Sequence, residues 1–175
     1  MVRSFLALAV AVLVAGFATA ADKFTLTGEN TKVEFVGTKK DGKHTGGFKT
    51  LAGEVTHEND AWKIDVTIET DSLYSDDAKL TGHLKSGDFF AVKDHKTAKF
   101  VTSKIAKGDK GYTVTGTLTL LGKSKEVTFP AEIAIGDTFI MKAEFKINRA
   151  DYGMTYGEGK VDNEVALTVN VAAKK

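Results

Sequence analysis

The chain has 175 residues, with 24 lysines and arginines against 23 aspartates and glutamates, and it has no cysteine. The absence of cysteine excludes disulfides and thiol chemistry, so stability must come from a packed core, which a single domain of this length can supply. The balanced charge argues against nucleic-acid binding, which needs a basic face, and against tight binding to anionic membrane surfaces.

Residues 1–20 have the pattern of a signal peptide. Arg3 precedes an uncharged apolar run over 5–17 and small residues at 18–20, which is the order found at signal-peptidase sites. The run is shorter than the ~20 residues of a spanning helix, so no stable membrane span is expected; a retained N-terminal anchor is the alternative. We expect cleavage near the bond between Ala20 and Ala21, and a periplasmic or secreted domain over 21–175. Because Arg3 is the one charged residue removed, this domain has no net charge.

The sequence after residue 20 predicts one domain of strands in which apolar and polar residues alternate. In 61–69, Trp62, Ile64, Val66 and Ile68 share one face, and polar or charged residues share the other; this period of two is typical of a half-buried strand. Short turns make neighbouring strands antiparallel and favour an all-β, up-and-down barrel. In chain order, the eight expected strands are 32–38, 46–57, 61–69, 98–105, 112–120, 126–135, 139–147 and 161–171.

Three positions indicate where the sheet bends. Within 46–57, Phe48 is out of step with Leu51, and a bulge near 49–50 would restore a common face. Gly53 and Gly116 lie inside expected strands, where glycine marks a bend or a close approach. If a channel passes Gly116, Gly116→Leu is expected to abolish ligand uptake and to leave folding largely intact.

One segment, 76–85, predicts a short helix inserted between strands. Ser75 can cap it, two aspartates follow at its positive end, and a lysine stands at its negative end. Leu80 and Leu84 are one turn apart and face inward together, and Gly87 is expected to end the helix. A single amphipathic insertion in an all-β chain predicts a cap on the mouth of the barrel, and hence a ligand inside it.

No arrangement of residues typical of an enzyme stands out. The His-Glu pair at 57–58 lacks the second histidine of a zinc protease, and Gly-Lys-Ser at 122–124 joins strand to strand instead of forming a phosphate loop. The histidines have no ligand-like spacing and are expected at surface or capping positions. We therefore expect no metal site and no enzymatic activity. An enzyme that uses Arg149, Asp151 and Tyr152 as its polar set is the alternative.

The segment 148–157 follows a strong strand and does not alternate. In a structural interpretation it is a loop folded over one end of the barrel, with Arg149 paired to a carboxylate. In a functional interpretation it belongs to a ligand mouth that is polar at its rim and aromatic inside. We favour the structural role for Arg149 and place Tyr152 and Met154 at the mouth.

Three segments together resemble the YceI-like family of exported, lipocalin-like proteins. They are HLKSGDFFAV at 83–92, LTLLGKSKEV at 118–127 and FKINRADYGM at 145–154. The resemblance covers essentially all of 24–173. It implies an extended eight-stranded antiparallel barrel of lipocalin type, with a helix against its mouth. It also implies that the central channel binds a polyisoprenoid, such as a quinone tail or a polyprenyl phosphate, without enzymatic activity.

The sequence departs from the family pattern at three turns. The family tends to have aspartate where this chain has Ala91, and it often has proline where His95 and Lys96 stand. The family turn Leu-His-Gly is represented here by Leu121 and Gly122. All three departures lie in expected turns, so the expected fold is unchanged.

We expect an exported binding protein that holds an isoprenoid lipid for transport, storage or sequestration, with no other cofactor. The alternation alone fits a barrel filled by side chains equally well, and the family resemblance favours a cavity. The alternative is a filled envelope stress or interaction scaffold without lipid, with the threonine face of 113–119 as a candidate surface. Whether the protein forms a homodimer is left open. The expected ligand-binding residues are Trp62, Ile64, Leu84, Phe89, Phe90, Phe100, Leu118, Phe139, Met141, Phe145, Tyr152 and Met154.

Overall fold

The computed structural model describes residues 22–58 and 61–175, so the expected signal peptide lies outside the described residues. The described part of the chain forms eleven strands, one α-helix and two single-turn 3-10 helices. In chain order these are β1 (Asp22–Thr27), β2 (Thr31–Lys39), β3 (Gly42–Phe48), β4 (Leu51–Glu58), β5 (Ala61–Glu69), η1 (Thr70–Ser72), β6 (Leu73–Ser75), α1 (Ala78–Lys85), β7 (Thr97–Gly108), β8 (Gly111–Leu120), β9 (Lys123–Ile135), β10 (Thr138–Asn148), η2 (Arg149–Tyr152) and β11 (Val161–Lys174).

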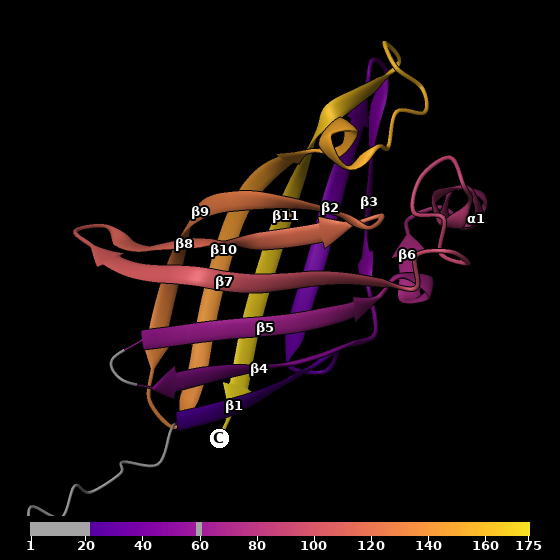
Figure 1. Ribbon diagram of the computed structural model, residues 1–175. Helices are drawn as coiled ribbons and strands as arrows, with labels where there is room; N and C mark the ends of the chain where they lie inside the picture. Colours follow the sequence, from indigo (N-terminus) through magenta and orange to yellow (C-terminus); the bar gives the residue numbers. More distant parts are fainter. Residues whose placement is uncertain (1–21, 59–60) are drawn as a thin grey trace, which may run out of the picture.

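The strands form one antiparallel sheet that curls over itself into a half-barrel. Their order is β1-β4-β5-β7-β8-β9-β10-β11-β2-β3-β6. In Figure 1, β4, β5, β7 and β8 cross in front of β10, β11 and β2. β9 joins these two layers, because its first part pairs with β8 and its last part pairs with β10. The expected all-β antiparallel architecture with one helix is confirmed.

The expectation of eight strands is wrong. In the described residues, β1 and β6 are additional strands, and the expected strand 46–57 is two strands, β3 and β4. β1 has only Phe24 and Leu26 as buried apolar residues, and β6 has only three residues. Such short patterns lack the alternation over several residues that identifies a strand from sequence.

The out-of-step Phe48 marks a corner between the two layers. Before the corner, β3 pairs with β2 and β6, and after it, β4 pairs with β1 and β5. The backbone N–H of Lys49 donates to the carbonyl of Ser72 at 3.2 Å, and that of Thr50 donates to the Ser72 hydroxyl at 3.0 Å. The sequence predicted a bulge within one strand at this point. In the structure the chain instead passes here from one layer of the sheet to the other.

Phe100 and the backbone of Val101 approach Gly116 closely inside the sheet. A Cβ at this position would lie 2.6 Å from Cζ of Phe100 and 2.6 Å from the carbonyl oxygen of Val101. Any side chain here would force both neighbours to move. Gly116 does not line the cavity described below, so the premise of a channel passing it is not met, and we expect Gly116→Leu to disturb folding.

Aromatic side chains fill the interior beside β1. The ring centroids of Phe24 and Trp62 are 6.3 Å apart. The ring of Phe139 lies 5.8 Å from that of Phe24 and 6.0 Å from that of Trp62. Phe24 and Phe139 are almost completely buried. This part of the half-barrel is packed core, so space for a ligand must lie elsewhere.

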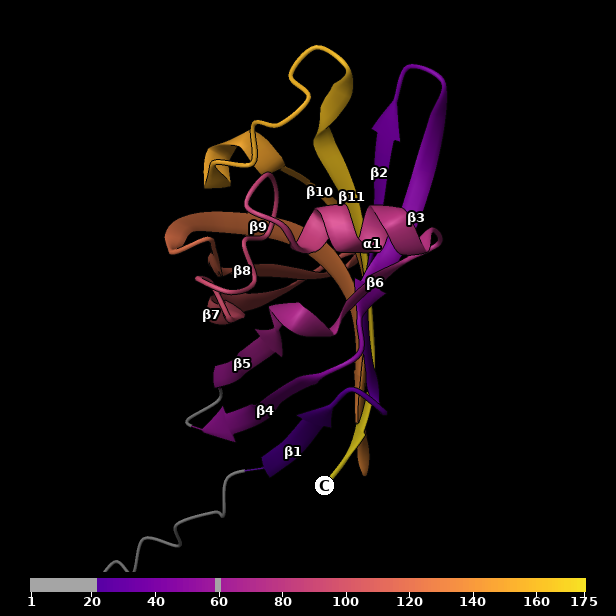
Figure 2. The same cartoon turned by 90° about the vertical axis from the view of Figure 1, so that its right-hand side faces the viewer.

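α1 packs beside β6 at the opposite end of the fold (Figure 2). Its N-cap is Asp77, whose carboxylate accepts a hydrogen bond from the backbone N–H of Leu80 at 2.6 Å. The expectation that Ser75 caps the helix is wrong. The Ser75 hydroxyl instead donates a hydrogen bond to the carbonyl of Asp77 at 2.8 Å. The helix ends at Lys85, before Gly87. Within the described residues, no helix is long and apolar enough to cross a membrane.

Candidate functional site

An apolar cavity of about 280 Å³ lies between α1 and the two layers of the sheet. Its size is close to the lower end of the ~300–1,000 Å³ range of small-molecule pockets. Several wall residues remain half-buried although they face the interior, among them Phe35, Leu118 and Leu167. Its apolar lining consists of Val33, Phe35, Phe48, Ile68, Leu80, Leu84, Phe89, Phe90, Ala98, Leu118, Leu120, Ile147, Met154, Tyr156, Val161, Val165 and Leu167.

Three neighbouring strands, β2, β11 and β10, form the back wall of the cavity. Phe35 on β2 lies opposite Leu167 on β11. Val165, two residues along β11 from Leu167, lies opposite Ile147 on β10. Because side chains alternate along a strand, these four residues point to the same side of the sheet. The strand pairing thus builds a continuous apolar surface facing α1.

Gly37 leaves part of this wall open. It continues the inward-facing series of Val33 and Phe35 on β2, and it lies opposite Val165 and His44. A Cβ built at Gly37 meets no atom within 4 Å. The space beside Gly37 is therefore available to a side chain or to a ligand.

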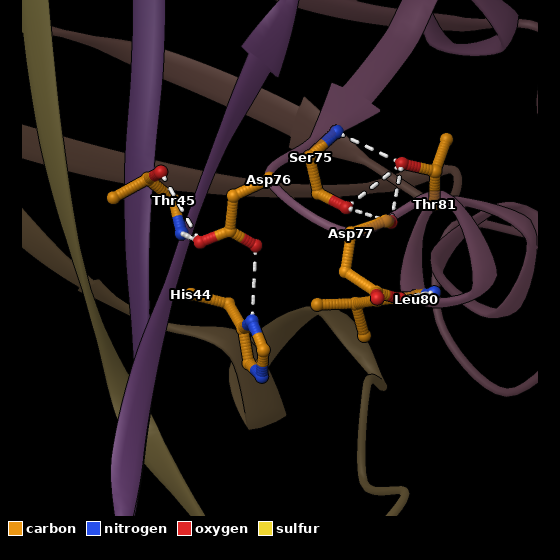
Figure 3. A network of polar contacts seen from close by, with 7 residues as sticks. All are labelled: His44, Thr45, Ser75, Asp76, Asp77, Leu80 and Thr81. Carbon is orange, nitrogen blue, oxygen red and sulfur yellow. Dashed lines mark hydrogen bonds and ion pairs between the residues drawn. The ribbon is translucent and has the colours of Figure 1, made fainter.

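A polar network attaches the N-terminal end of α1 to β3 (Figure 3). The carboxylate of Asp76 lies 2.9 Å from Nδ1 of His44 and accepts the backbone N–H of Thr45 at 2.9 Å. The Thr45 N–H bond, followed by the bond with His44, lowers the pKa of Asp76 from its ordinary value. On the helix side, the Thr81 hydroxyl accepts the backbone N–H of Ser75 at 2.9 Å. The network holds α1 over the cavity.

The polar side chains that line the cavity, most of them at least partly exposed, indicate where it opens, and we call this set the polar rim. Nε2 of His83 on α1 lies 2.8 Å from the carboxylate of Asp88. The His83 ring also meets Tyr156 edge-on, with centroids 4.7 Å apart, and Phe89 at 5.1 Å. Thus α1 contacts the segment after η2 at the rim. The rim residues are Thr38, Lys39, His44, His83, Arg149 and Asp162.

Arg149 is a buried cation at this rim, with only 3% of its surface exposed. Its guanidinium donates from Nη1 to the carbonyl of Met154 at 2.7 Å, from Nη2 to that of Val161 at 3.1 Å, and from Nε to that of Asp162 at 3.0 Å. The register of β11 with β2 breaks between Val161 and Val165.

These three bonds mean that Arg149 fixes the segment between η2 and β11. The expected pairing with a carboxylate is wrong: no ion pair of Arg149 occurs within 4.0 Å among the described residues. Burial lowers the pKa of Arg149, and the charge of Glu158 acts in the opposite direction. The structural role that we favoured agrees with this geometry, and the same side chain also lines the cavity.

The structure brings five of the twelve expected ligand-binding residues together at the cavity: Leu84, Phe89, Phe90, Leu118 and Met154. Leu84 lies on the inward face that the amphipathic pattern of α1 predicted, and Phe89 and Phe90 come from the turn after the helix. Wall residues absent from the expected set include Val33, Phe35, Ile147, Val165 and Leu167. The alternation of the last strand and of 139–147 placed three of these on apolar faces, but it gave no sign that those faces border open space.

The other seven expected residues lie outside the cavity lining. Trp62 and Phe139 belong to the packed aromatic core, and Ile64 and Met141 are buried. Phe100 and Phe145 both pack against Phe129. Tyr152 is buried in η2, where burial, and to a lesser degree the charge of Asp151, raise its pKa. Alternation identifies an inward face, but it does not distinguish a filled interior from a hollow one.

The polar set considered for an enzyme is not gathered around open space. Asp151 is exposed, Tyr152 is buried, and Arg149 donates to backbone carbonyls. Across residues 22–58 and 61–175, no group of three or more His, Asp or Glu side chains is placed to hold a metal ion.

Comparison of the sequence with known proteins gives a consistent set of relatives. The family model described as YceI-like domain matches residues 24–173. A UPF0312 protein of Serratia proteamaculans is 33% identical over 178 residues, covering 91% of this chain and 90% of that protein. A UPF0312 protein of Pseudomonas aeruginosa is 33% identical over 185 residues, covering 95% and 93%.

Solved structures share the fold. BcnA of Burkholderia cenocepacia has a TM-score of 0.75 at 29% identity, covering 82% of this chain and 96% of BcnA. The YCEI protein of Campylobacter jejuni has a TM-score of 0.63 at 25% identity, covering 74% and 84%. A polyisoprenoid binding domain from Saccharophagus degradans, implicated in plant cell wall breakdown, has a TM-score of 0.69 at 15% identity, covering 87% and 97%. At that identity the likeness shows the fold alone.

Proposed function

The chain belongs to the YceI-like family, and we propose that it binds the apolar chain of a lipid in the cavity beside α1. The proposed ligand class is a polyisoprenoid, such as a quinone tail or a polyprenyl phosphate. The polyisoprenoid binding domain of the same fold supports this choice. We further propose that residues 1–20 direct export, so that the ligand is met outside the cytoplasm and is carried or held there without chemical change.

One observation carries the proposal: the interior is hollow where α1 covers it and packed where β1 closes it. A monomeric core is normally filled to the density of an organic crystal, and open apolar space costs stability. Here Phe35, Leu118 and Leu167 stay half-buried beside such space. An apolar chain in the cavity would remove this surface from water, with a gain of about 25 cal/mol per Å².

The distribution of polar groups supports one orientation of the ligand. Lys39, His44 and His83 stand at the rim, whereas the walls inside it are apolar. A polar head group can keep its hydrogen bonds at the rim, while burial of the same group among Val33, Phe35 and Leu167 would leave it unpaired. The apolar tail therefore enters first, and the head group stays beside α1.

Gly37→Phe tests the proposal because it adds a ring to the inward face of β2, at a position where a Cβ meets no atom within 4 Å. The protein is titrated with the fluorescent apolar probe N-phenylnaphthylamine, which is then displaced with farnesol. We expect at least a tenfold loss of affinity for both in Gly37→Phe. The matched control is Gly136→Phe in the exposed β9–β10 turn, where a Cβ also meets no atom within 4 Å.

Unfolding in urea shows whether both variants keep the native fold. A wild-type protein that binds neither probe nor farnesol would contradict the proposal and favour the interaction scaffold. Equal binding by Gly37→Phe and the wild type would show that the ligand lies elsewhere.

A further inference from the structure

On one strand of each layer of the sheet, the cavity lining ends at a phenylalanine. On β7, Ala98 lines the cavity and Phe100, the next residue on the same face, does not. On β10, Ile147 lines the cavity and Phe145, the next residue on its face, does not. In each case a phenylalanine occupies the first position beyond the open space.

These two phenylalanines are joined by a third, Phe129 on β9. The rings of Phe129 and Phe145 are stacked, with centroids 4.0 Å apart and planes inclined by 6°. The rings of Phe100 and Phe129 lie 5.7 Å apart. β7 belongs to the front layer, β10 to the back layer, and β9 joins them (Figure 1). We call this set, Phe100, Phe129 and Phe145, the phenylalanine stack; it crosses the interior from one layer to the other.

Beyond the phenylalanine stack, the inward side chains of β5, β8 and β10 are buried. Phe129 itself is only 3% exposed, and Ile64, Met141 and Val114 are buried further in. The aromatic cluster around Trp62 fills the end beside β1. A chain that enters from the rim thus meets three rings and then packed core.

We propose that the phenylalanine stack is the inner end of the binding cavity and limits the length of apolar chain that the protein takes in. The inference rests on the proposed function and adds a specificity determinant to it. The first isoprene units of a tail bind between α1 and the stack, and the remainder of a long tail stays outside the rim. Each methylene buried before the stack adds affinity, and those beyond it add none.

The test is the dependence of affinity on chain length, measured by displacement of N-phenylnaphthylamine with geraniol, farnesol, geranylgeraniol and solanesol. For the wild type we expect affinity to rise about tenfold or more for the first added isoprene units and to level off before solanesol. Phe145→Ala removes one ring from the stack and should move the plateau to a longer prenol. Phe100→Ala serves as a second variant, since both side chains are half-buried and their loss is tolerated better than that of Phe129.

Met141→Ala is the matched control, because Met141 is buried on β10 but does not line the cavity. It should lower stability and leave the plateau unchanged. Affinity that rises through solanesol in the wild type would overturn the inference, as would an unchanged plateau in both Phe145→Ala and Phe100→Ala. In both of these outcomes prenols still bind, so the proposed function would stand while the inference fails. Failure of every prenol to displace the probe from the wild type would instead overturn the proposed function, and this inference with it.

Discussion

The carboxylate of Asp76 lies 2.9 Å from Nδ1 of His44, and this contact ties the residue before the cap of α1 to strand β3. The same carboxylate accepts the backbone N–H of Thr45. Because Leu80 and Leu84 of α1 form part of the cavity wall, the contact determines where that wall lies. The helix is thus positioned by a short polar network as well as by its apolar face.

Asp76→Asn should lower the stability of the protein at neutral pH. Hydrogen bonds from Thr45 and His44 lower the pKa of Asp76, so the folded state binds a proton at this group less readily than the unfolded state does. Its stabilisation is therefore present above the ordinary aspartate pKa of about 4 and is lost as the pH falls through the lower folded value. Urea unfolding of the wild type and the variant between neutral pH and pH ~3 measures this difference, which should shrink in acid.

Asp137→Asn, in the exposed β9–β10 turn, is the control for the Asp76 experiment. It should unfold like the wild type throughout this range. A stability difference between wild type and Asp76→Asn that stays constant down to the acid end would show that the carboxylate has no special role in attaching α1.

Ala91 should be a site where substitution increases stability. Its φ of 43° lies in the left-handed region, which costs a residue with a Cβ about 1–2 kcal/mol. Asparagine tolerates this conformation better, so Ala91→Asn is expected to raise the free energy of unfolding by about 0.5–1 kcal/mol. The family resemblance points the same way, since the family tends to have aspartate here. A decrease in stability, measured by urea unfolding, would contradict this account.

Arg149→Lys should be strongly destabilising although it keeps the charge. Lysine cannot reproduce three hydrogen bonds from a planar guanidinium to separate carbonyls. Hydrogen bonds to charged groups contribute about 1.5–3 kcal/mol each, so we expect a loss of about 3 kcal/mol or more in urea unfolding. Amide hydrogen exchange should increase between η2 and β11. Lys160→Arg, in the same segment and exposed, is the control; equal effects of the two variants would argue against the role given to Arg149.

Much of the fold follows from the sequence because its alternation is local. The ranges 61–69, 112–120 and 139–147 match β5, β8 and β10 closely. The change of layer at Lys49 and Thr50 could not be predicted in this way, since it depends on which distant strands pair with β3 and β4. The parity slip of Phe48 was its one local sign.

The candidate site was predictable only in part. Leu84, Phe89 and Phe90 followed from the amphipathic helix and the turn after it, and they line the cavity. Trp62 and Phe139 had an equally clear inward pattern, yet they fill the core. The difference depends on how side chains from both layers share the interior volume, which no single strand encodes.

The most direct test of the central claim is organic extraction and mass spectrometry of the full chain purified from its own cell envelope, with Gly37→Phe prepared in parallel. We predict a polyisoprenoid or quinone species near one molecule per wild-type chain, reduced at least tenfold in Gly37→Phe and retained in Gly136→Phe. A wild-type protein without bound lipid, or equal amounts of lipid in the wild type and Gly37→Phe, would contradict binding in the cavity beside α1.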